Sequence, residues 1–563
     1  MIIGWPLRLW RSLSAIGLVL GTLFFAAALT PSLVPRSYLI QGLLSGFSFS
    51  AGYAIGVLIR SLWRYLELPA PTERLVSLTK LVAAPLCAVV AIAFLWKSAG
   101  WQDSIRGLMG LPPLADSHSL QVCFIAVMVF LVALALARLF LAVFGLTFRR
   151  SARLLPTRIA NLMGVIVAAL VLWLLVKDVA LRAVLTLLDS SYRQYDALIE
   201  PERPQPPSPE KTGSAASLLN WDELGRAGRE FIASATTAEE IGAFTGKPSM
   251  EPIRVYAGLR SAETAAARAK LALEELKRVG AFERAALVVI TPTGTGWVDP
   301  DAMTGLEYLQ NGNVASVAQQ YSYLSSPLSL LIEPDYASQA ARALFVEVYG
   351  YWTTLPKDRR PKFYLHGLSL GSMNSEKSTQ LFEIFEDPIQ GALWAGPPFP
   401  SSTWRRVTDA RNAGAPAWLP EFRNGSLVRF MNQNGSPVPA DAPWGSLRIV
   451  YLQYSSDPIV FFDYRDAYRK PAWMTVPRGP DVSPSLRWYP VVTMLQLGFD
   501  LLIATGTPMG YGHVYAPEDY TEAWRQVLDR RDWSDEEIAR LKQHLTTLLN
   551  APEIAPVQDN RGG

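Results

Sequence analysis

The sequence predicts an α/β protein in two parts: an N-terminal bundle of about five transmembrane helices, then a domain with a mostly parallel sheet. Three observations predict this fold class. Long apolar stretches fill the first 190 of 563 residues, and only 18% of the whole chain is charged, against about 25% in ordinary soluble proteins. A proline-rich segment comes next. Beyond it, strand patterns alternate with helix patterns, which is typical of a parallel sheet covered by helices.

Five stretches predict the transmembrane helices, since a membrane-spanning helix needs about 20 mainly apolar residues. They are residues 12–35, 37–59, 75–96, 119–148 and 159–176. Lys80 and Arg138 lie inside two of them, where long side chains can reach an interface or, for Arg138, act as a functional charge. The first stretch is too long for a signal peptide and lacks a good cleavage site, so we expect a retained anchor.

Basic residues predict the orientation of these stretches, because cytoplasmic loops carry the excess of Lys and Arg. The loops that follow the second and fourth stretches are rich in arginine, whereas the loops on the opposite side are poorer. We therefore expect a multi-pass protein of the cytoplasmic (inner) membrane, with its N-terminus inside and its C-terminal domain periplasmic. The basic residues expected inside are Arg8, Arg11, Arg60, Arg64, Arg74, Arg149, Arg150, Arg153 and Arg158.

The domain boundaries follow from these patterns. We expect a transmembrane domain over 1–190, a Pro-rich linker over 191–217 and a catalytic domain over 218–563; the linker includes the sequence EPERPQPPSPEKTGSAAS. In the C-terminal domain, apolar runs predict strands and helix-forming runs predict helices. The strands are expected at 253–259, 285–290, 362–367, 391–396 and 448–454, and the helices at 261–279, 336–352 and 372–385.

The stretch KFYLHGLSLGSMNSEKS, residues 362–378, contains a G-x-S-x-G pattern centred on Ser369. A predicted strand precedes the pattern and a predicted helix follows it. Such a strand–turn–helix context is typical of a nucleophile elbow, in which a strained turn presents the serine. The alternative is an ordinary glycine-containing turn, but the context favours Ser369 as a nucleophile.

A serine nucleophile needs a histidine base, and the chain has only four histidines: His118, His366, His513 and His544. His118 lies in a loop before the fourth apolar stretch, His366 lies on the strand beside the serine, and His544 lies on a C-terminal helix pattern. His513 lies in the glycine-rich loop MGYGHVYAPEDY, late in the chain. Order and elimination favour His513, because the expected order is serine, acid, histidine.

The acid is expected after a late strand of the sheet. Asp457 follows the predicted strand 448–454 directly and precedes Pro458. Asp463 and Asp466 are nearby rivals, and a turn-forming role is the alternative for Asp457. We expect Asp457 to orient the imidazole of His513.

Two groups of backbone amides are candidates for the oxyanion hole, which needs preorganised N–H donors. One is Leu370, the residue after the nucleophile. The other is the loop after strand 285–290, which contains Gly294, Thr295, Gly296 and Trp297. The GTG in this loop lacks the third glycine or the lysine of a nucleotide-binding motif.

Composition bounds the partners and cofactors. A net charge of +3 is too small to indicate nucleic-acid binding. The two cysteines, Cys87 and Cys123, lie in apolar stretches, so the C-terminal domain has no thiolate for a zinc site. We expect no cofactor and no metal.

Five segments together carry a family resemblance: TPTGTGW, HGLSLG, WAGPP, YLQYSSDPIV and GYGHVY, placed behind several apolar stretches. The chain resembles the bacterial membrane-anchored alpha/beta-hydrolase family, over nearly its whole length. The resemblance implies an alpha/beta-hydrolase catalytic domain, a triad of Ser369, Asp457 and His513, and an oxyanion site near the Thr293–Trp297 loop. The family has an acidic residue directly before the nucleophile, where this chain has Leu368.

The expected function is that of a membrane-anchored serine hydrolase, esterase- or lipase-like, or an acyltransferase. It would form an acyl-enzyme from a lipid or other ester and pass the acyl group to water or to an alcohol. The alternative is a non-catalytic hydrolase-fold protein that serves binding, transport or assembly in the cell envelope.

Overall fold

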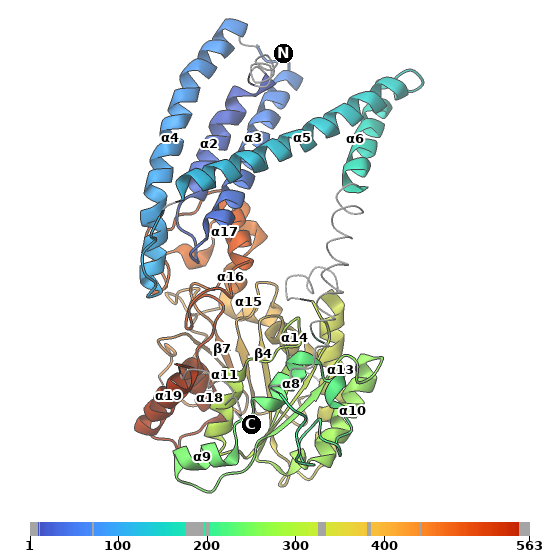
Figure 1. Ribbon diagram of the computed structural model, residues 1–563, viewed down its shortest axis with the longest axis vertical. Helices are drawn as coiled ribbons and strands as arrows, with labels where there is room; N and C mark the ends of the chain where they lie inside the picture. Colours follow the sequence, from blue (N-terminus) through green and yellow to red (C-terminus); the bar gives the residue numbers. More distant parts are fainter. Residues whose placement is uncertain are drawn as a thin grey trace, which may run out of the picture. The chain divides into compact units, whose positions relative to one another are not determined.

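The chain forms two compact units in the computed structural model (Figure 1). The first contains Met1–Leu188 and Ser455–His513, and the second contains Asp189–Tyr454 and Val514–Gly563. We expected contiguous domains, but the segment Ser455–His513 groups with the N-terminal helices. The structure describes residues 10, 12–69, 72–116, 118–174, 196, 203–324, 334–379, 384–439 and 441–550.

Among its described residues, the N-terminal part of the first unit has five helices: α2 (Ala15–Ala28), α3 (Tyr38–Tyr65), α4 (Glu73–Leu108), α5 (Ser119–Ser151) and α6 (Thr157–Leu174). Within the described residues, four helices, α3 to α6, are long and apolar enough to cross a membrane. We expected about five. Helix α2 has 14 residues, or about 21 Å, against a hydrocarbon core of about 30 Å. It ends shortly before Pro31, which cannot donate to a continuing helix. Residues 175–176 of the fifth expected stretch lie outside the described residues.

The segment Ser455–His513 adds short elements to this unit: α16 (Pro458–Phe461), η4 (Tyr464–Ala467), η5 (Ala472–Met474) and α17 (Val492–Leu501). Helix α17 contacts both α2 and α3. Val492 joins Ala27, Ala28 and Leu44 in one buried apolar cluster. A polar contact supports the same packing, since Nε2 of Gln496 donates to the carbonyl oxygen of Thr30 at 3.0 Å.

The second unit is built on a seven-stranded sheet in which every pair is parallel, in the order β1-β3-β2-β4-β5-β7-β6. All five strands that we predicted are present, and β3 and β6 are additional. The strands are β1 (Ile253–Ala257), β2 (Ala286–Thr291), β3 (Val314–Gln319), β4 (Lys362–Leu368), β5 (Gly391–Ala395), β6 (Val428–Met431) and β7 (Arg448–Leu452). The central strands are buried along almost their whole length, as expected of a parallel sheet covered on both faces.

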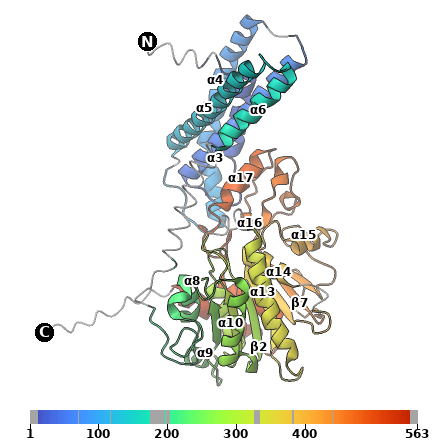
Figure 2. The same cartoon turned by 90° about the vertical axis from the view of Figure 1, so that its right-hand side faces the viewer.

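Helices cover both faces of this sheet (Figures 1 and 2). Helices α10 (Ala265–Arg278), α13 (Pro334–Thr354) and α14 (Leu370–Ser378) pack in sequence on one face, and α11 (Pro300–Leu309), α18 (Pro517–Leu528) and α19 (Asp535–Asn550) do so on the other. The described part of this unit also contains η2 (Trp221–Glu223), α8 (Gly225–Ala233), α9 (Ala238–Thr245), η3 (Ala281–Glu283) and α15 (Ser402–Asp409). The predicted fold class is confirmed. Part of the expected helix 372–385 lies outside the described residues.

The continuous described part of the expected linker, residues 203–217, contains no helix and no named strand. It is nevertheless bound to the second unit. Arg278 donates from Nη1 to the carbonyl oxygen of Pro209 at 2.6 Å, and Ser217 donates from Oγ to Oε1 of Glu275 at 2.6 Å. These contacts hold the segment along helix α10, whereas we expected an extended spacer.

Candidate active site

Ser369 lies at the turn between β4 and α14, with φ 58° and ψ −127°. Because it is not glycine, this positive φ is strained, at a cost of roughly 1–3 kcal/mol. Its own N–H donates to the carbonyl oxygen of Ala395 at 3.0 Å, and its carbonyl accepts the hydroxyl of Ser372 at 2.7 Å. The surrounding structure therefore holds the strained conformation, as a nucleophile elbow requires.

The two glycines of the G-x-S-x-G pattern allow close backbone contacts around this turn. A Cβ atom on Gly367 would lie 2.4 Å from the carbonyl carbon of Gly371. A Cβ atom on Gly371 would lie 2.1 Å from the carbonyl oxygen of Thr291, at the end of β2. Both contacts are shorter than van der Waals distances, so α14 can follow β4 this tightly only with glycine at both positions.

The loop after β2 forms a tight turn. Thr293 donates from its N–H to the carbonyl oxygen of Trp297, and Gly296 donates to that of Thr293, both at 2.9 Å. Side chains of the neighbouring strands hold the loop: the hydroxyl of Tyr256 donates to the carbonyl oxygen of Gly296 at 2.6 Å, and Nε2 of Gln320 donates to that of Thr295 at 3.2 Å. The short distance between Gly371 and Thr291 brings the start of this loop to the elbow.

These contacts differentiate the candidate oxyanion donors. Leu370 is the first residue of α14, so its N–H has no acceptor within the helix, and the positive end of the helix dipole lies there. The N–H of Gly296 is engaged within its turn. Among the four expected loop donors, Gly296 is therefore the least suited, because its N–H would have to leave the carbonyl oxygen of Thr293.

Asp457 and His513 form a buried pair in the first unit, while Ser369 belongs to the second. Nδ1 of His513 lies 2.7 Å from Oδ2 of Asp457, and the two side chains are 6% and 0% exposed. A carboxylate can only accept, so Nδ1 carries the proton and Nε2 has the lone pair of the neutral ring. Oδ1 of Asp457 accepts the N–H of Ile459 at 2.8 Å and caps α16. Asp457 thus caps α16 with one carboxylate oxygen and orients the imidazole of His513 with the other.

Ser456 and Asp481 support this pair, and sequence reasoning missed both. Ser456 donates from Oγ to Oδ2 of Asp481 at 2.6 Å, and the same oxygen of Ser456 accepts the N–H of Gly512 at 2.9 Å. The network therefore holds the residue before His513 next to the residue before Asp457. In the sequence, only the position of Ser456 directly before Asp457 pointed to this network. Asp481 lies in an irregular segment, so no pattern marked it.

The rival acids have other partners. Oδ1 of Asp463 accepts the N–H of Arg465 at 3.0 Å, and Oδ2 of Asp466 accepts the N–H of Asp463 at 3.2 Å. Burial raises the pKa of Asp466 to about 7. These two carboxylates form the capping box of η4.

Two of the other histidines lie in packed surroundings in the second unit. The ring of His366 is buried against Trp524, its Nδ1 lies 2.9 Å from the carbonyl oxygen of Leu393, and burial lowers its pKa to about 4. His366 therefore stays neutral and belongs to the core. The ring of His544 stacks on Phe244, and its Nε2 lies 3.1 Å from the hydroxyl of Tyr308. In the part of the chain that the structure describes, no group of three His, Cys, Asp or Glu side chains is placed to hold a metal ion.

A parallel sheet whose central strand leads through a strained serine into a helix defines a protein of the hydrolase fold. The chain belongs to the alpha/beta-hydrolase family. That family matches residues 253–541, and the family's N-terminal region, described as the alpha/beta-hydrolase family N-terminus, matches residues 29–235. The family resemblance is thus confirmed, and membership favours a hydrolase-type enzyme. Searches of curated proteins and of solved structures returned no match.

Proposed function

We propose that this protein is a membrane-anchored serine hydrolase or acyltransferase that acts through Ser369, His513 and Asp457. The observation that carries the proposal is the conformation of Ser369, with φ 58° directly after β4. Backbone strain of this kind clusters at active sites, where the surrounding structure holds it. The buried pair of Asp457 and His513 supports the proposal, because it supplies an oriented base and comes in the expected chain order.

The proposed reaction starts when Oγ of Ser369 attacks the carbonyl carbon of an ester and Nε2 of His513 takes the hydroxyl proton. Asp457 stabilises the resulting imidazolium. The amide of Leu370 and amides of the Gly294–Trp297 loop would stabilise the oxyanion. The tetrahedral intermediate then expels the alcohol, which takes the proton from Nε2 and leaves an acyl-serine. Water or a second alcohol attacks this acyl group, again with His513 as base, and Ser369 is regenerated.

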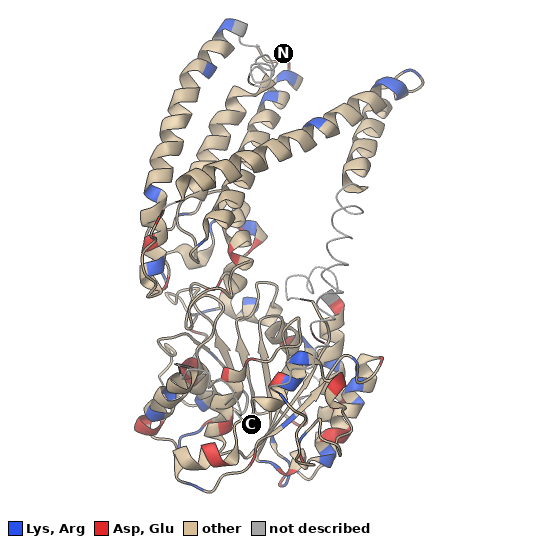
Figure 3. Ribbon diagram, viewed as in Figure 1, with Lys and Arg blue, Asp and Glu red and all other residues tan. Residues whose placement is uncertain are grey.

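We propose a lipid or other membrane-derived ester as the substrate, because the membrane helices would keep the enzyme at a lipid surface. The catalytic residues would lie outside the cytoplasmic membrane. Lys and Arg gather at the ends of α3 to α6 that form the α3–α4 and α5–α6 connections (Figure 3). If those connections are cytoplasmic, the chain beyond α6 is on the other side. This inference does not depend on whether the short helix α2 crosses the membrane.

An activity-based probe tests the proposed chemistry. Membranes that contain the full chain are treated with a fluorophosphonate, which reacts with activated serines, and the labelled residue is identified by mass spectrometry. We expect labelling at Ser369 and none in Ser369→Ala. The matched control is Ser402→Ala, which removes an exposed serine hydroxyl of α15 away from the elbow contacts. Absence of labelling in the wild type, or equal labelling of Ser369→Ala, would show a non-catalytic binding, transport or assembly protein instead.

The proposed orientation has its own test. Alkaline phosphatase fused after residue 215 is expected to be active, and a reporter that needs the cytoplasm is expected to be inactive at the same position. The opposite pattern would place the hydrolase unit in the cytoplasm without changing the proposed chemistry.

A further inference from the structure

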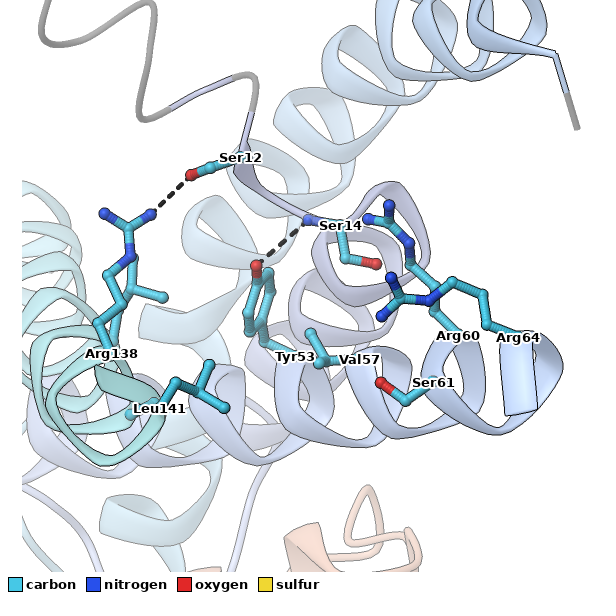
Figure 4. Close-up of a pocket in the computed structure, with 11 residues that line it drawn as sticks. Ser12, Ser14, Tyr53, Val57, Arg60, Ser61, Arg64, Arg138 and Leu141 are labelled. Atoms are coloured by element: carbon cyan, nitrogen blue, oxygen red, sulfur yellow. Dashed lines mark hydrogen bonds between the residues drawn. The ribbon is translucent and has the colours of Figure 1, made fainter. Parts of the chain in front are cut away.

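The first unit contains an open cavity of about 700 Å³ between α3, α5 and the chain that enters α2 (Figure 4). One face of α3 supplies Tyr53, Val57, Arg60, Ser61 and Arg64, which follow the i, i+4, i+7, i+8, i+11 spacing of a helical stripe. A matching stripe of α5 supplies Leu134, Ala137, Arg138 and Leu141. Ser12 and Ser14 complete the lining.

Three arginines give this cavity a concentrated positive charge. Figure 4 shows Arg138 on one side of Tyr53, with Arg60 and Arg64 on the other. Nη2 of Arg138 donates to Oγ of Ser12 at 2.6 Å. None of the described residues that line the cavity is acidic, so its described lining offers no carboxylate to neutralise these guanidinium groups.

Membrane anchoring alone explains Arg60 and Arg64 but not Arg138. Arg60 and Arg64 lie in the last turns of α3, where basic residues commonly reach the interface. Helix α5 continues from Arg138 to Ser151, about 20 Å at 1.5 Å per residue. An arginine side chain is too short to cover that length along the helix. Arg138 instead bonds to Ser12 at the cavity, and a charged side chain within a membrane-spanning helix marks a functional site by default.

Four apolar side chains of the lining indicate what carries the anion. Val57, Leu134, Ala137 and Leu141 come from helices that are long and apolar enough to lie in a membrane. A small hydrophilic anion would gain nothing from contact with these apolar side chains, whereas the acyl chain of a lipid would pack against them. Guanidinium groups match the geometry of phosphate oxygens, and basic pockets between membrane helices bind phosphate-bearing head groups.

We propose that this cavity binds the phosphate group of an anionic lipid, held between Arg138 on α5 and Arg60 and Arg64 on α3. The lipid chain lies along Val57, Leu134 and Leu141. This site is separate from Ser369 and does not need the proposed hydrolase activity. Because basic residues gather at the same ends of these helices, the lipid belongs to the leaflet on the proposed cytoplasmic side.

Binding to the purified full chain in a neutral detergent tests the proposal. The probe is dioctanoylphosphatidic acid, and dissociation constants are measured by isothermal titration calorimetry. Arg138→Gln and the double variant Arg60→Gln/Arg64→Gln are each expected to weaken binding about tenfold or more, because each loses charge-assisted hydrogen bonds. The matched control is Arg150→Gln/Arg153→Gln, which removes two exposed charges near the end of α5 that do not line the cavity. It is expected to bind within about twofold of the wild type.

Further arms separate the sources of the signal. Inorganic phosphate and dioctanoylglycerol, which lack the lipid chains and the phosphate respectively, are expected to bind at least about tenfold more weakly than phosphatidic acid. Ala137→Trp fills the cavity without removing a charge and is also expected to abolish binding. This variant tests the site independently of the arginine variants, in case one of those fails to fold. Ser369→Ala is expected to bind like the wild type.

Three outcomes would overturn the proposal. Equal binding of inorganic phosphate would indicate a site for soluble anions. Equal weakening by the Arg150→Gln/Arg153→Gln control would indicate unspecific attraction to the basic ends of the helices. Undiminished binding by Ala137→Trp would place the lipid elsewhere on the protein.

Discussion

Arg36 and Asp500 form an ion pair inside the first unit, with Nε of Arg36 2.8 Å from Oδ1 of Asp500 and both side chains 0% exposed. The second oxygen of Asp500 accepts the N–H of Leu33 at 3.1 Å. Nη1 of Arg36 also donates to Oε1 of Gln41 at 3.0 Å. The pair thus joins α17 to the chain between α2 and α3. Buried charges of this kind are costly to separate, because each needs the other in a medium that excludes water.

Asp500→Ala is therefore expected to destabilise the first unit by about 3–5 kcal/mol, since it leaves the Arg36 guanidinium buried without its counter-ion. The measurement is thermal unfolding of the full chain in detergent, followed by tryptophan fluorescence. Asp532→Ala serves as control, because Asp532 pairs with Arg530 at 2.6 Å on the surface, where a lost ion pair costs less than about 1 kcal/mol. Equal losses of stability in the two variants would contradict the assigned burial. The double variant Arg36→Met/Asp500→Leu is expected to recover part of the loss.

Gly371→Ala is expected to destabilise the second unit by about 3 kcal/mol or more and to abolish fluorophosphonate labelling. The added methyl group would lie 2.1 Å from the carbonyl oxygen of Thr291, which is backbone and cannot rotate away. Gly350→Ala is the control, because a Cβ atom there meets nothing within 4 Å and Gly350 lies inside α13. That change is expected to stabilise the protein by up to about 1 kcal/mol. Normal labelling of Gly371→Ala would mean that the elbow does not need this close contact.

Asp457→Asn is expected to slow the reaction of Ser369 with fluorophosphonate about 1,000- to 10,000-fold, with little change in stability. The amide still fits beside His513, but it favours the wrong tautomer of the ring and cannot stabilise the imidazolium. The second-order labelling rate of the full chain measures this effect. Asp463→Asn is the matched control, since asparagine caps a helix as well as aspartate does and Asp463 caps η4. A larger loss in Asp463→Asn would reassign the acid.

The stability of the second unit is expected to fall as the pH rises from about 4 to about 8, in part because of Asp299. Burial, reinforced by the charge of Asp301, raises the pKa of Asp299 from 3.8 to about 8. The folded state therefore binds this proton more tightly than the unfolded chain does. The resulting stabilisation is complete below pH 4 and is lost as the pH passes 8.

Asp299→Asn tests this linkage, because an amide does not titrate and still caps α11. We expect the melting temperature of the variant to exceed that of the wild type above pH 8 and the difference to shrink toward pH 5. Melting curves at five pH values between 5 and 9 measure it. A constant difference across this range would show that Asp299 does not titrate there.

The sequence predicted the parts of the fold that depend on local patterns. Five strands of the second unit were predicted because each is a nearly continuous apolar run. Strand β3 was missed because it contains Ser316 and Gln319, which are buried, and the amide of Gln319 donates to the carbonyl oxygen of Ala265 at 3.0 Å. Strand β6 was missed because Arg429 interrupts it. That arginine is buried too, since its guanidinium stacks 3.8 Å from the centre of the Trp444 ring. Tertiary partners, which no local pattern shows, decide both strands.

Local patterns likewise predicted some features of the candidate site, whereas others depend on tertiary contacts. The strained turn at Ser369 and the contact between Asp457 and His513 could be predicted, because the elbow has a motif and the acid and histidine follow in a fixed order. The joint catalytic role of the three residues stays a prediction. The contact between Ser456 and Asp481 could not be predicted, because the two are 25 residues apart and no periodic element links them. Nor did the pattern of apolar residues show that α2 ends after 14 residues, since the apolar run continues past the end of the helix.

The division of the first unit into two chain segments has a consequence for synthesis. The ribosome makes the N-terminal helices first, then Asp189–Tyr454, and only afterwards the segment that contains α17. Until then, Arg36 lacks the carboxylate of Asp500, and the apolar cluster around Ala28 and Leu44 lacks Val492. The packing of the N-terminal helices therefore stays incomplete while more than two hundred further residues are translated. A protein shortened at the linker would never leave that state.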